Sequence, residues 1–479
     1  MAFTFTSISS SIIDVSGGTG TLSELYTDAI AHTPGCMTNP SANVYQIEGN
    51  RELELSGTTI LTVETGDTIQ WDRTSNGNIL EVQVNATIVF EAGSTMNMDA
   101  SGNHMGYAYY YGRLDVQGTS GSRVVFDNCG RNLMYPYGSG SQSNGGAHTV
   151  AYLTIQNVVN TSGYAMFFNP SIATLHDDVT HTYDNIIAKA GPTESTGNAW
   201  LMYWNFGSYH NFTFTNIDIT NGNGWLCYGT ANLVIDGGTA LNGDTDCRVY
   251  GSPGVGLMAA NYDPVNTKAF GNHNANQNKT LFKNYTFDDG DNGVYTLGTL
   301  DRGAVLYCES CTFQNATNVA NLTRGILVLY NPTYTSISGN NFVYSSAGGG
   351  TVLHARKMTL SVEDSGGSPI ADATVTFRQK QGRETWVCTT DSNGDVLDPL
   401  GEPIWLIEQE ETSNGVYSQW SDGTGDQVHV IEVYKDGYEP HSEEVAMNQD
   451  RTKTIVLSTE TQSGTTLNNV TINGTATIY

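Results

Sequence analysis

Gly112-Arg-Leu-Asp-Val-Gln-Gly-Thr119, followed closely by Ser122-Arg-Val-Val-Phe126, is the stretch of sequence that decides the fold. Apolar and polar residues alternate in both pieces, and Gly, Thr or Ser separates them, which predicts two short strands joined by a turn. Altered copies of this phrase occur at 151–157, 210–216, 231–237, 312–315 and 334–340. So short a strand buries its apolar face only when it stacks on copies of itself, and the repeat therefore predicts a solenoid.

Composition and charge narrow the class of protein further. The chain has 479 residues, 53 of them Gly, and its hydrophobic content of 38% is spread evenly, which suits many short strands. The net charge of −28, with only 20 Lys and Arg, argues against nucleic acid as a partner, because phosphate binding needs clustered bases. No run approaches 18 apolar residues, so we expect no membrane span.

The N-terminal residues lack the basic region, apolar core and cleavage site of a secretory signal. We therefore expect localisation in a virion, which reaches the outside when the host cell lyses. The seven cysteines are scattered and odd in number, so no disulfide framework is implied. Cys308-Glu-Ser-Cys311 has no second pair nearby, so we expect no metal site, and we expect no cofactor.

Changes in sequence texture divide the chain into four segments. Residues 1–50 are expected to form a cap or attachment segment with a short amphipathic helix, because Thr21-Leu-Ser-Glu24 reads as a capping box. Residues 51–355 carry the solenoid repeat. Residues 356–458 carry more charge and longer strands joined by Asn-Gly and Asp-Gly turns, which favours a small β-sandwich. Residues 459–479 are expected to form a strand-like C-terminal tail.

The solenoid segment resembles the right-handed parallel β-helices of pectate lyases, phage tailspikes and phage decoration or fibre proteins. The rung at 112–126 carries this resemblance, and the irregular rung spacing with long loops favours the right-handed form. Enzymes and non-enzymes share the rung, so the resemblance implies an architecture and not an activity. It also implies a homo-oligomer, with a trimer as one form.

The third segment carries a second resemblance. The order Gly367-Ser-Pro-Ile-Ala-Asp-Ala-Thr-Val375, then Thr390-Asp-Ser-Asn-Gly394, then Val433-Tyr-Lys-Asp-Gly-Tyr438 resembles the carboxypeptidase-regulatory-like family. The resemblance implies a seven-stranded, transthyretin-like (Ig-like) sandwich that binds or spaces without catalytic residues. The tail that follows this segment resembles the solenoid repeat in sequence. We expect the tail either to fold back onto the β-helix or to pair with a neighbouring subunit.

Carboxylates and aromatic residues are the candidate site residues. Asp288, Asp289 and Asp291 would be the catalytic candidates of a sugar-cleaving enzyme, although Asp-Asp-Gly-Asp-Asn-Gly is the composition of a turn. The expected binding residues are aromatic, since such side chains stack on sugars and anchor protein interfaces. They are Tyr109, Tyr110, Tyr111, Trp200 and Trp204, and simple packing of loops on the solenoid is the alternative.

The preferred function is a non-enzymatic structural protein of a phage virion, either a capsid decoration or a fibre-like component. It would act through assembly with other virion or capsid proteins, with adhesion to host-surface glycans as an additional role. The alternative is a tailspike-type polysaccharide depolymerase on the same β-helix. A cell-surface adhesin is a weaker alternative, because it would need a signal and an anchoring segment.

Overall fold

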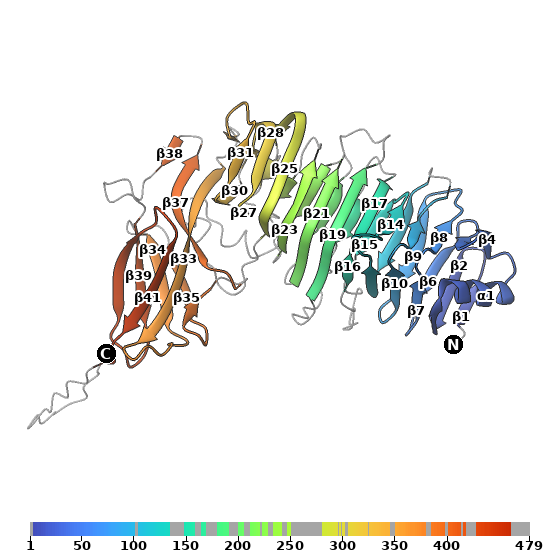
Figure 1. Cartoon of the computed structure of the whole chain (residues 1–479), viewed down its shortest axis with the longest axis horizontal. Helices are drawn as coiled ribbons and strands as arrows, with labels where there is room; N and C mark the ends of the chain where they lie inside the picture. The colour runs from blue at the N-terminus through green and yellow to red at the C-terminus, as the bar shows by residue number, and fades with distance from the viewer. Residues whose placement is uncertain are drawn as a thin grey trace, which may run out of the picture.

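The computed structural model shows a chain built almost entirely of strands, with one α-helix in the described residues. The structure describes every residue except 1–2, 101–103, 135–147, 159–163, 169–179, 191–199, 206–210, 221–222, 229–232, 242–246, 251–279, 296, 298, 302–304, 324, 345–349, 380–384, 398–400, 413–414, 418–427 and 461–479. Most strands pair in parallel with the equivalent strand one coil further along, and the coils form an elongated stack (Figure 1). The expected all-β class with long parallel runs is confirmed.

Three ladders of strands run along this coil stack. Ladder A is the 13-stranded sheet, and its members after β1 are parallel. Its strands are β1 (Thr4–Ile8), β2 (Ile12–Gly17), β6 (Glu52–Leu55), β9 (Gly77–Val82), β12 (Gly106–Tyr110), β15 (Arg131–Met134), β18 (Tyr164–Phe168), β20 (Trp200–Asn205), β22 (Asn223–Tyr228), β24 (Cys247–Tyr250), β26 (Thr299–Asp301), β29 (Ala320–Leu322) and β32 (Phe342–Tyr344).

Ladders B and C lie within the 24-stranded sheet. Ladder B contains β3 (Thr19–Thr21), β7 (Ile60–Val63), β10 (Thr87–Glu91), β13 (Arg113–Gln117), β16 (Thr149–Ala151), β27 (Val305–Glu309) and β30 (Ile326–Tyr330). Ladder C contains β4 (Met37–Ser41), β5 (Val44–Ile47), β8 (Thr68–Trp71), β11 (Thr95–Asn97), β14 (Val124–Asp127), β17 (Leu153–Val158), β28 (Thr312–Asn318) and β31 (Thr333–Thr335). Four long strands cross from ladder B to ladder C: β19 (Thr180–Ala190), β21 (Asn211–Thr220), β23 (Leu233–Leu241) and β25 (Thr280–Tyr295).

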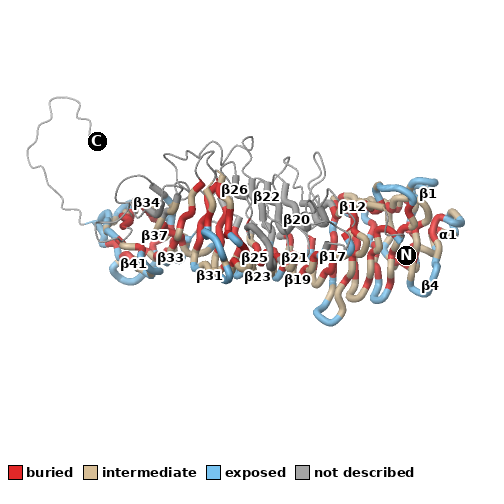
Figure 2. Tube along the Cα trace, turned by 90° about the horizontal axis from the view of Figure 1, so that it is seen from above, coloured by how far each residue is buried: buried red, intermediate tan, exposed pale blue. Residues whose placement is uncertain are grey.

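The core of the coil stack consists of columns of apolar side chains, one from each coil. Period-two alternation places every second residue of a strand inside, and parallel pairing in register stacks these residues on their counterparts. Phe287, Phe313 and Tyr334 illustrate one column, with consecutive ring centroids 5.4 and 5.8 Å apart. Figure 2 shows the buried residues running along the inside of the stack.

Both ends of the coil stack are covered. At the N-terminal end, α1 (Leu22–His32) packs Leu22, Leu25 and Ala29 into the core, and the predicted capping box between Thr21 and Glu24 is present. Strands β2, β3 and β5 pair in parallel with β6, β7 and β8, so the ladders begin before residue 51.

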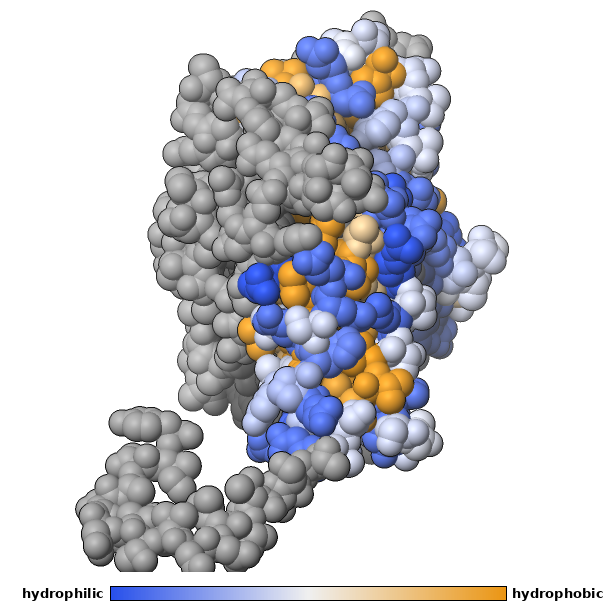
Figure 3. Space-filling view, turned by 90° about the vertical axis from the view of Figure 1, so that its left-hand side faces the viewer, coloured by the Kyte–Doolittle hydropathy of each residue, from blue (hydrophilic) through white to orange (hydrophobic). Residues whose placement is uncertain are grey.

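At the C-terminal end, two sheets enclose a separate apolar core. The 4-stranded sheet has the order β35-β34-β39-β40, and strands β36, β37, β38 and β41 attach to β33, directly or through β37. These strands are β33 (Thr351–Asp364), β34 (Thr374–Gln379), β35 (Thr385–Thr389), β36 (Asp395–Val396), β37 (Ile404–Thr412), β38 (Gly415–Tyr417), β39 (Val428–Tyr434), β40 (His441–Ala446) and β41 (Arg451–Leu457). Seen from this end, apolar residues are interspersed among polar ones on the described surface (Figure 3).

Candidate functional site

Two of the three predicted binding tyrosines lie near the surface of ladder A. Tyr109 is half-buried on β12, and its ring is parallel to that of Tyr111, with 9° between the planes and 6.2 Å between the centroids. Tyr110 points the other way, is fully buried, and donates a hydrogen bond to Asn132 Oδ1 at 3.4 Å. Tyr110 is therefore part of the core and cannot contact a ligand from outside, whereas Tyr109 and Tyr111 can.

Carboxylates lie beside the tyrosine pair on the same outer face. Strand pairing puts Asp14, Glu54 and Glu81 in register on consecutive coils, and Tyr109 follows Glu81 on the next coil. The Gln83 amide donates to Glu54 Oε1 at 3.2 Å and also to Glu81 Oε1. We call Asp14, Glu52, Glu54, Glu81, Gln83, Tyr109 and Tyr111 the carboxylate–tyrosine surface.

The protonation of this surface changes near neutral pH. Burial, the charge of Glu81 and a hydrogen bond with Glu81 raise the pKa of Glu52 to about 7. Burial and the charges of Asp14 and Glu81 raise the pKa of Glu54 as well. Glu52 therefore holds a proton at mildly acidic pH beside the Glu81 carboxyl group. A carboxyl group with a pKa near neutrality can donate or accept a proton under ordinary conditions.

The two predicted tryptophans lie on one strand of ladder A. Trp200 and Trp204 belong to β20, where Trp200 pairs with Tyr164 of β18 and Trp204 pairs with Phe168. Their side chains fall outside the described residues, so their predicted role in binding stays a prediction.

The three predicted catalytic aspartates lie on β25. Asp288 is buried and accepts hydrogen bonds from Gln314 Nε2 at 2.7 Å and Asn315 Nδ2 at 2.9 Å, which tie it to the next coil. Asp289 is also buried, and the side chain of Asp291 lies outside the described residues. The expected turn is a bulge inside the strand, because the register shifts between Asp288 and Gly293. The contacts of Asp288 give it a structural role.

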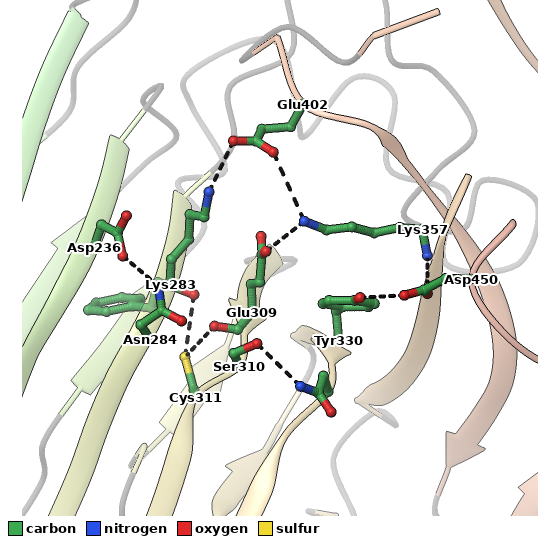
Figure 4. A network of polar contacts seen from close by, with 12 residues as sticks. Asp236, Lys283, Asn284, Glu309, Ser310, Cys311, Tyr330, Lys357, Glu402 and Asp450 are labelled. Carbon is green, nitrogen blue, oxygen red and sulfur yellow. Dashed lines mark hydrogen bonds and ion pairs between the residues drawn. The ribbon is translucent and has the colours of Figure 1, made fainter. Parts of the chain in front are cut away.

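A second polar cluster joins the coil stack to the C-terminal sheets (Figure 4). Strand β33 runs through both parts: its first half pairs in parallel with β30, and its second half pairs in parallel with β41. Lys357 lies on it, with Nζ 2.6 Å from Glu309 Oε1 and 4.0 Å from Glu402 Oε2. Lys283 Nζ lies 3.0 Å from Glu402 Oε1, so the two lysines and two glutamates form a chain of ion pairs.

Asp450 extends this network toward β41. It accepts hydrogen bonds from the Tyr330 hydroxyl at 2.5 Å and from the backbone N–H of Lys357 at 2.9 Å. Burial and the contact with Asp450 raise the pKa of Tyr330 to about 12. Lys357 Nζ also lies 5.1 Å from the centre of the Tyr330 ring, a cation–π contact.

An apolar cluster accompanies these ion pairs. Trp405 of β37 is almost fully buried, and its ring centroid lies 5.7 Å from that of Tyr307 and 5.5 Å from that of Tyr330. Val328 and Leu353, from the outer side of ladder B, belong to the same cluster. We call the ion pairs and this cluster the junction. Burial of an aromatic residue at a well-packed contact resists relative movement of the two parts.

The described residues contain neither a metal-binding cluster nor a membrane-spanning helix. No group of three or more His, Cys, Asp or Glu side chains among the described residues could hold a metal ion. Within the same residues, no helix has the length and apolarity that crossing a membrane requires. Cys308 and Cys311 are both buried, and Cys311 Sγ donates to the Phe282 carbonyl at 3.3 Å.

Sequence reasoning missed both the carboxylate–tyrosine surface and the junction. Alternation in Glu52-Leu-Glu-Leu55 indicates that both glutamates face outward, but it cannot show which residue of the next coil lies beside them. The junction joins residues that lie far apart in the chain, such as Lys283 and Glu402, without any local motif.

In comparisons with known proteins, no protein-family model matches this chain and no match was found among curated proteins.

Proposed function

We propose that this protein is a non-enzymatic structural component of a phage virion, a capsid decoration or fibre-like protein. In this proposal the coil stack is a right-handed parallel β-helix, and the C-terminal sheets are a transthyretin-like, Ig-like sandwich. The virion is its location, and its partners are other virion proteins, with host glycans as a further ligand.

The junction is the observation that carries the proposal. A continuous strand, β33, belongs to the hydrogen-bonded ladders of both parts, and buried Trp405 and the ion pairs of Lys357 fix their orientation. A spacer that has to hold its ends at a fixed distance needs such a connection. The stacked ladders supply the length, since each coil adds about 4.8 Å.

Mass spectrometry of purified phage particles from a lysate that produces this protein tests the proposal. We expect the protein in the particles at a fixed copy number, high for a decoration and low for a fibre or tail component. Its absence from washed particles would overturn the virion assignment.

The tailspike-type depolymerase is a second candidate, favoured by the carboxylate–tyrosine surface. Glycoside hydrolysis uses one protonated and one ionised carboxyl group, and a carboxyl pKa near neutrality is typical of the acid. Glu52 has such a pKa, and the Tyr109 and Tyr111 rings of the same surface offer a place on which sugars stack.

Incubation with host capsular polysaccharide separates the two functions. The structural proposal predicts that no oligosaccharide is released by the wild-type protein. The depolymerase function would be supported if the wild-type protein releases oligosaccharide and the variants Glu52→Gln and Glu81→Gln do not. If Asp288→Asn still releases oligosaccharide, Asp288 is not catalytic.

A further inference from the structure

One outward-facing column of ladder C is formed largely by threonines. Strand pairing places one residue of each coil in register along the whole ladder, and seven of these eleven residues are threonine. In order they are Val44, Thr68, Thr95, Val125, Thr154, Ile187, Asp218, Thr239, Thr286, Thr312 and Thr333. One of the seven threonines, Thr154, is buried, and its hydroxyl accepts a hydrogen bond from Arg123 Nε at 2.9 Å. We call this column and the outward residues beside it the threonine face.

The threonine face carries little net charge in a very acidic protein, because Arg123 and Lys189 beside the column offset Asp127 and Asp288. Asp218 is the only charged residue in the column, although the chain has a net charge of −28. At its N-terminal end the neighbouring outward positions are amides, with Gln70 Nε2 donating to Gln46 Oε1 at 2.6 Å. Ladder A differs, because Asp14, Glu54 and Glu81 follow one another on its outer face. Two acidic copies repel each other least where the surfaces that meet have a low net charge.

The size of the threonine face matches that of a stable interface. Eleven positions at about 4.8 Å spacing extend over about 48 Å, and strands with their corners measure about 15 Å across. Each copy would then bury about 700 Å², close to the roughly 800 Å² per partner of a standard interface. Figure 1 shows strands β8, β14, β17, β28 and β31 of ladder C along the coil stack.

The repeat also makes the face complementary to itself. Two copies have the same spacing between coils. Side chains of one copy can therefore lie between those of the other along the full length of the threonine face. A hydroxyl both donates and accepts a hydrogen bond, so threonines of two copies can pair in either direction, whereas ionised carboxylates cannot pair with each other. A symmetric interface of this kind requires one surface to fit a copy of itself.

We propose that the threonine face is the interface between two copies of this chain, packed side by side with their ladders C in contact. The interface leaves the junction and the carboxylate–tyrosine surface uncovered, since these belong to ladders A and B and the C-terminal sheets. The proposal does not depend on the virion assignment.

Sedimentation equilibrium of the full chain, with a triple variant, tests this proposal. Thr95→Glu, Thr239→Glu and Thr312→Glu together place six carboxylates in the interface, and we expect dissociation to increase more than tenfold. The control is Thr452→Glu with Thr454→Glu, two exposed threonines of β41 at the C-terminal end, which should leave association unchanged. A monomeric wild type at about 10 μM, or a triple variant that associates as strongly as the wild type, would overturn the proposal.

Thiol labelling provides a second readout with a conservative change. In Thr286→Cys the new thiol faces outward in the column, and wild-type labelling supplies the background. We expect the thiol to react more slowly with a maleimide dye above the dissociation constant than below it. Thr454→Cys should react equally at both concentrations. Equal rates for Thr286→Cys at both concentrations would exclude an interface at this face.

Discussion

A left-handed backbone residue recurs at the corner between ladders B and C. Asn185, Asn216, Asn284 and Asn331 all have φ between 50° and 53°. Strand pairing places them along one corner, with Gly237 and Ser310, also at positive φ, on the coils between them. Asparagine tolerates this conformation better than other non-glycine residues and offers a side-chain donor. The side-chain amide of Asn284 donates a hydrogen bond from Nδ2 to Asp236 Oδ1 on the preceding coil, at 2.8 Å. Asn284 therefore shapes the corner and ties two coils together, and Asn331 does the same through Ser310 Oγ at 3.4 Å.

Substitution of Asn284 separates these two contributions. Asn284→Ala loses the hydrogen bond and strains the backbone, and we expect it to destabilise the protein by about 1–2 kcal/mol. Asn284→Gly loses only the bond, so the loss should be smaller. Thermal unfolding followed by circular dichroism measures both. An alanine variant at least as stable as the glycine variant would contradict this account.

Buried histidines make the coil stack sensitive to acid. His148 is fully buried, with its ring bonded to the Gly112 carbonyl at 2.9 Å and to the Tyr183 hydroxyl at 2.8 Å. Burial lowers its pKa to about 4, below its ordinary value of 6.5. The unfolded chain binds the proton first, so stability is lost as the pH falls from about 6.5 toward 4. We expect the melting temperature to fall over this range.

The variant His148→Gln tests the source of that pH dependence. It should melt lower than the wild type at pH 7, because packing and hydrogen bonds are lost, but its melting temperature should depend less on pH between 6.5 and 4. His429, whose pKa is also lowered by burial to about 4, remains and preserves part of the slope. An unchanged slope in His148→Gln would contradict the assignment.

Glu52 makes the stability of the protein depend on pH in the direction opposite to that of His148. Its pKa is raised to about 7 in the folded chain, so the folded state binds the proton more tightly than the unfolded state. Stability therefore falls as the pH rises from about 4.5 to 7. Glu52→Gln removes the charge, and we expect it to stabilise the protein by about 1 kcal/mol at pH 8 with little effect at pH 4. Thermal melting at the two pH values measures this, and an equal effect at both would contradict it.

At the scale of elements, β33 makes the junction a continuation of the coil stack. Trp405→Ala removes the ring that β37 places against Tyr307 and Tyr330, and we expect a loss of about 3 kcal/mol in junction stability. Hydrogen exchange at 351–357 and 404–407 should report it locally. Val387→Ala, at a side chain that is 51% exposed, is the control and should change neither segment. Faster exchange throughout the coil stack in Trp405→Ala would contradict a local role.

At the scale of the whole molecule, the junction fixes the orientation of the C-terminal sheets at the end of an elongated coil stack (Figure 1). Salt weakens exposed ion pairs, but the apolar part of the junction persists. Small-angle scattering of the wild type should therefore give the same maximum dimension, for the same oligomeric state, at 0.1 M and 1 M salt. Trp405→Ala combined with Lys357→Met should broaden the distance distribution. A salt-dependent dimension in the wild type would contradict a rigid junction.

The sequence predicts much of the local structure and less of the candidate sites. Alternation in 112–126 predicts β13 and β14, and the capping box at Thr21 predicts the start of α1. The grouping of Tyr109 with Tyr110 was misleading, because adjacent strand residues face opposite sides and only one of them reaches the surface. The acidic run at 288–291 looked like a turn and proved to be a bulged strand, since its partner strand fixes the register.

The sequence by itself determined that this protein is built of short parallel strands capped by a helix, because alternation, turn residues and capping are local properties of the chain. Tertiary structure alone decided which carboxylates lie side by side, which threonines form one face and that Lys357 pairs with Glu309 and Glu402. The reason is physical: each of these contacts depends on the register between coils, and register depends on loop lengths and packing that no single strand encodes.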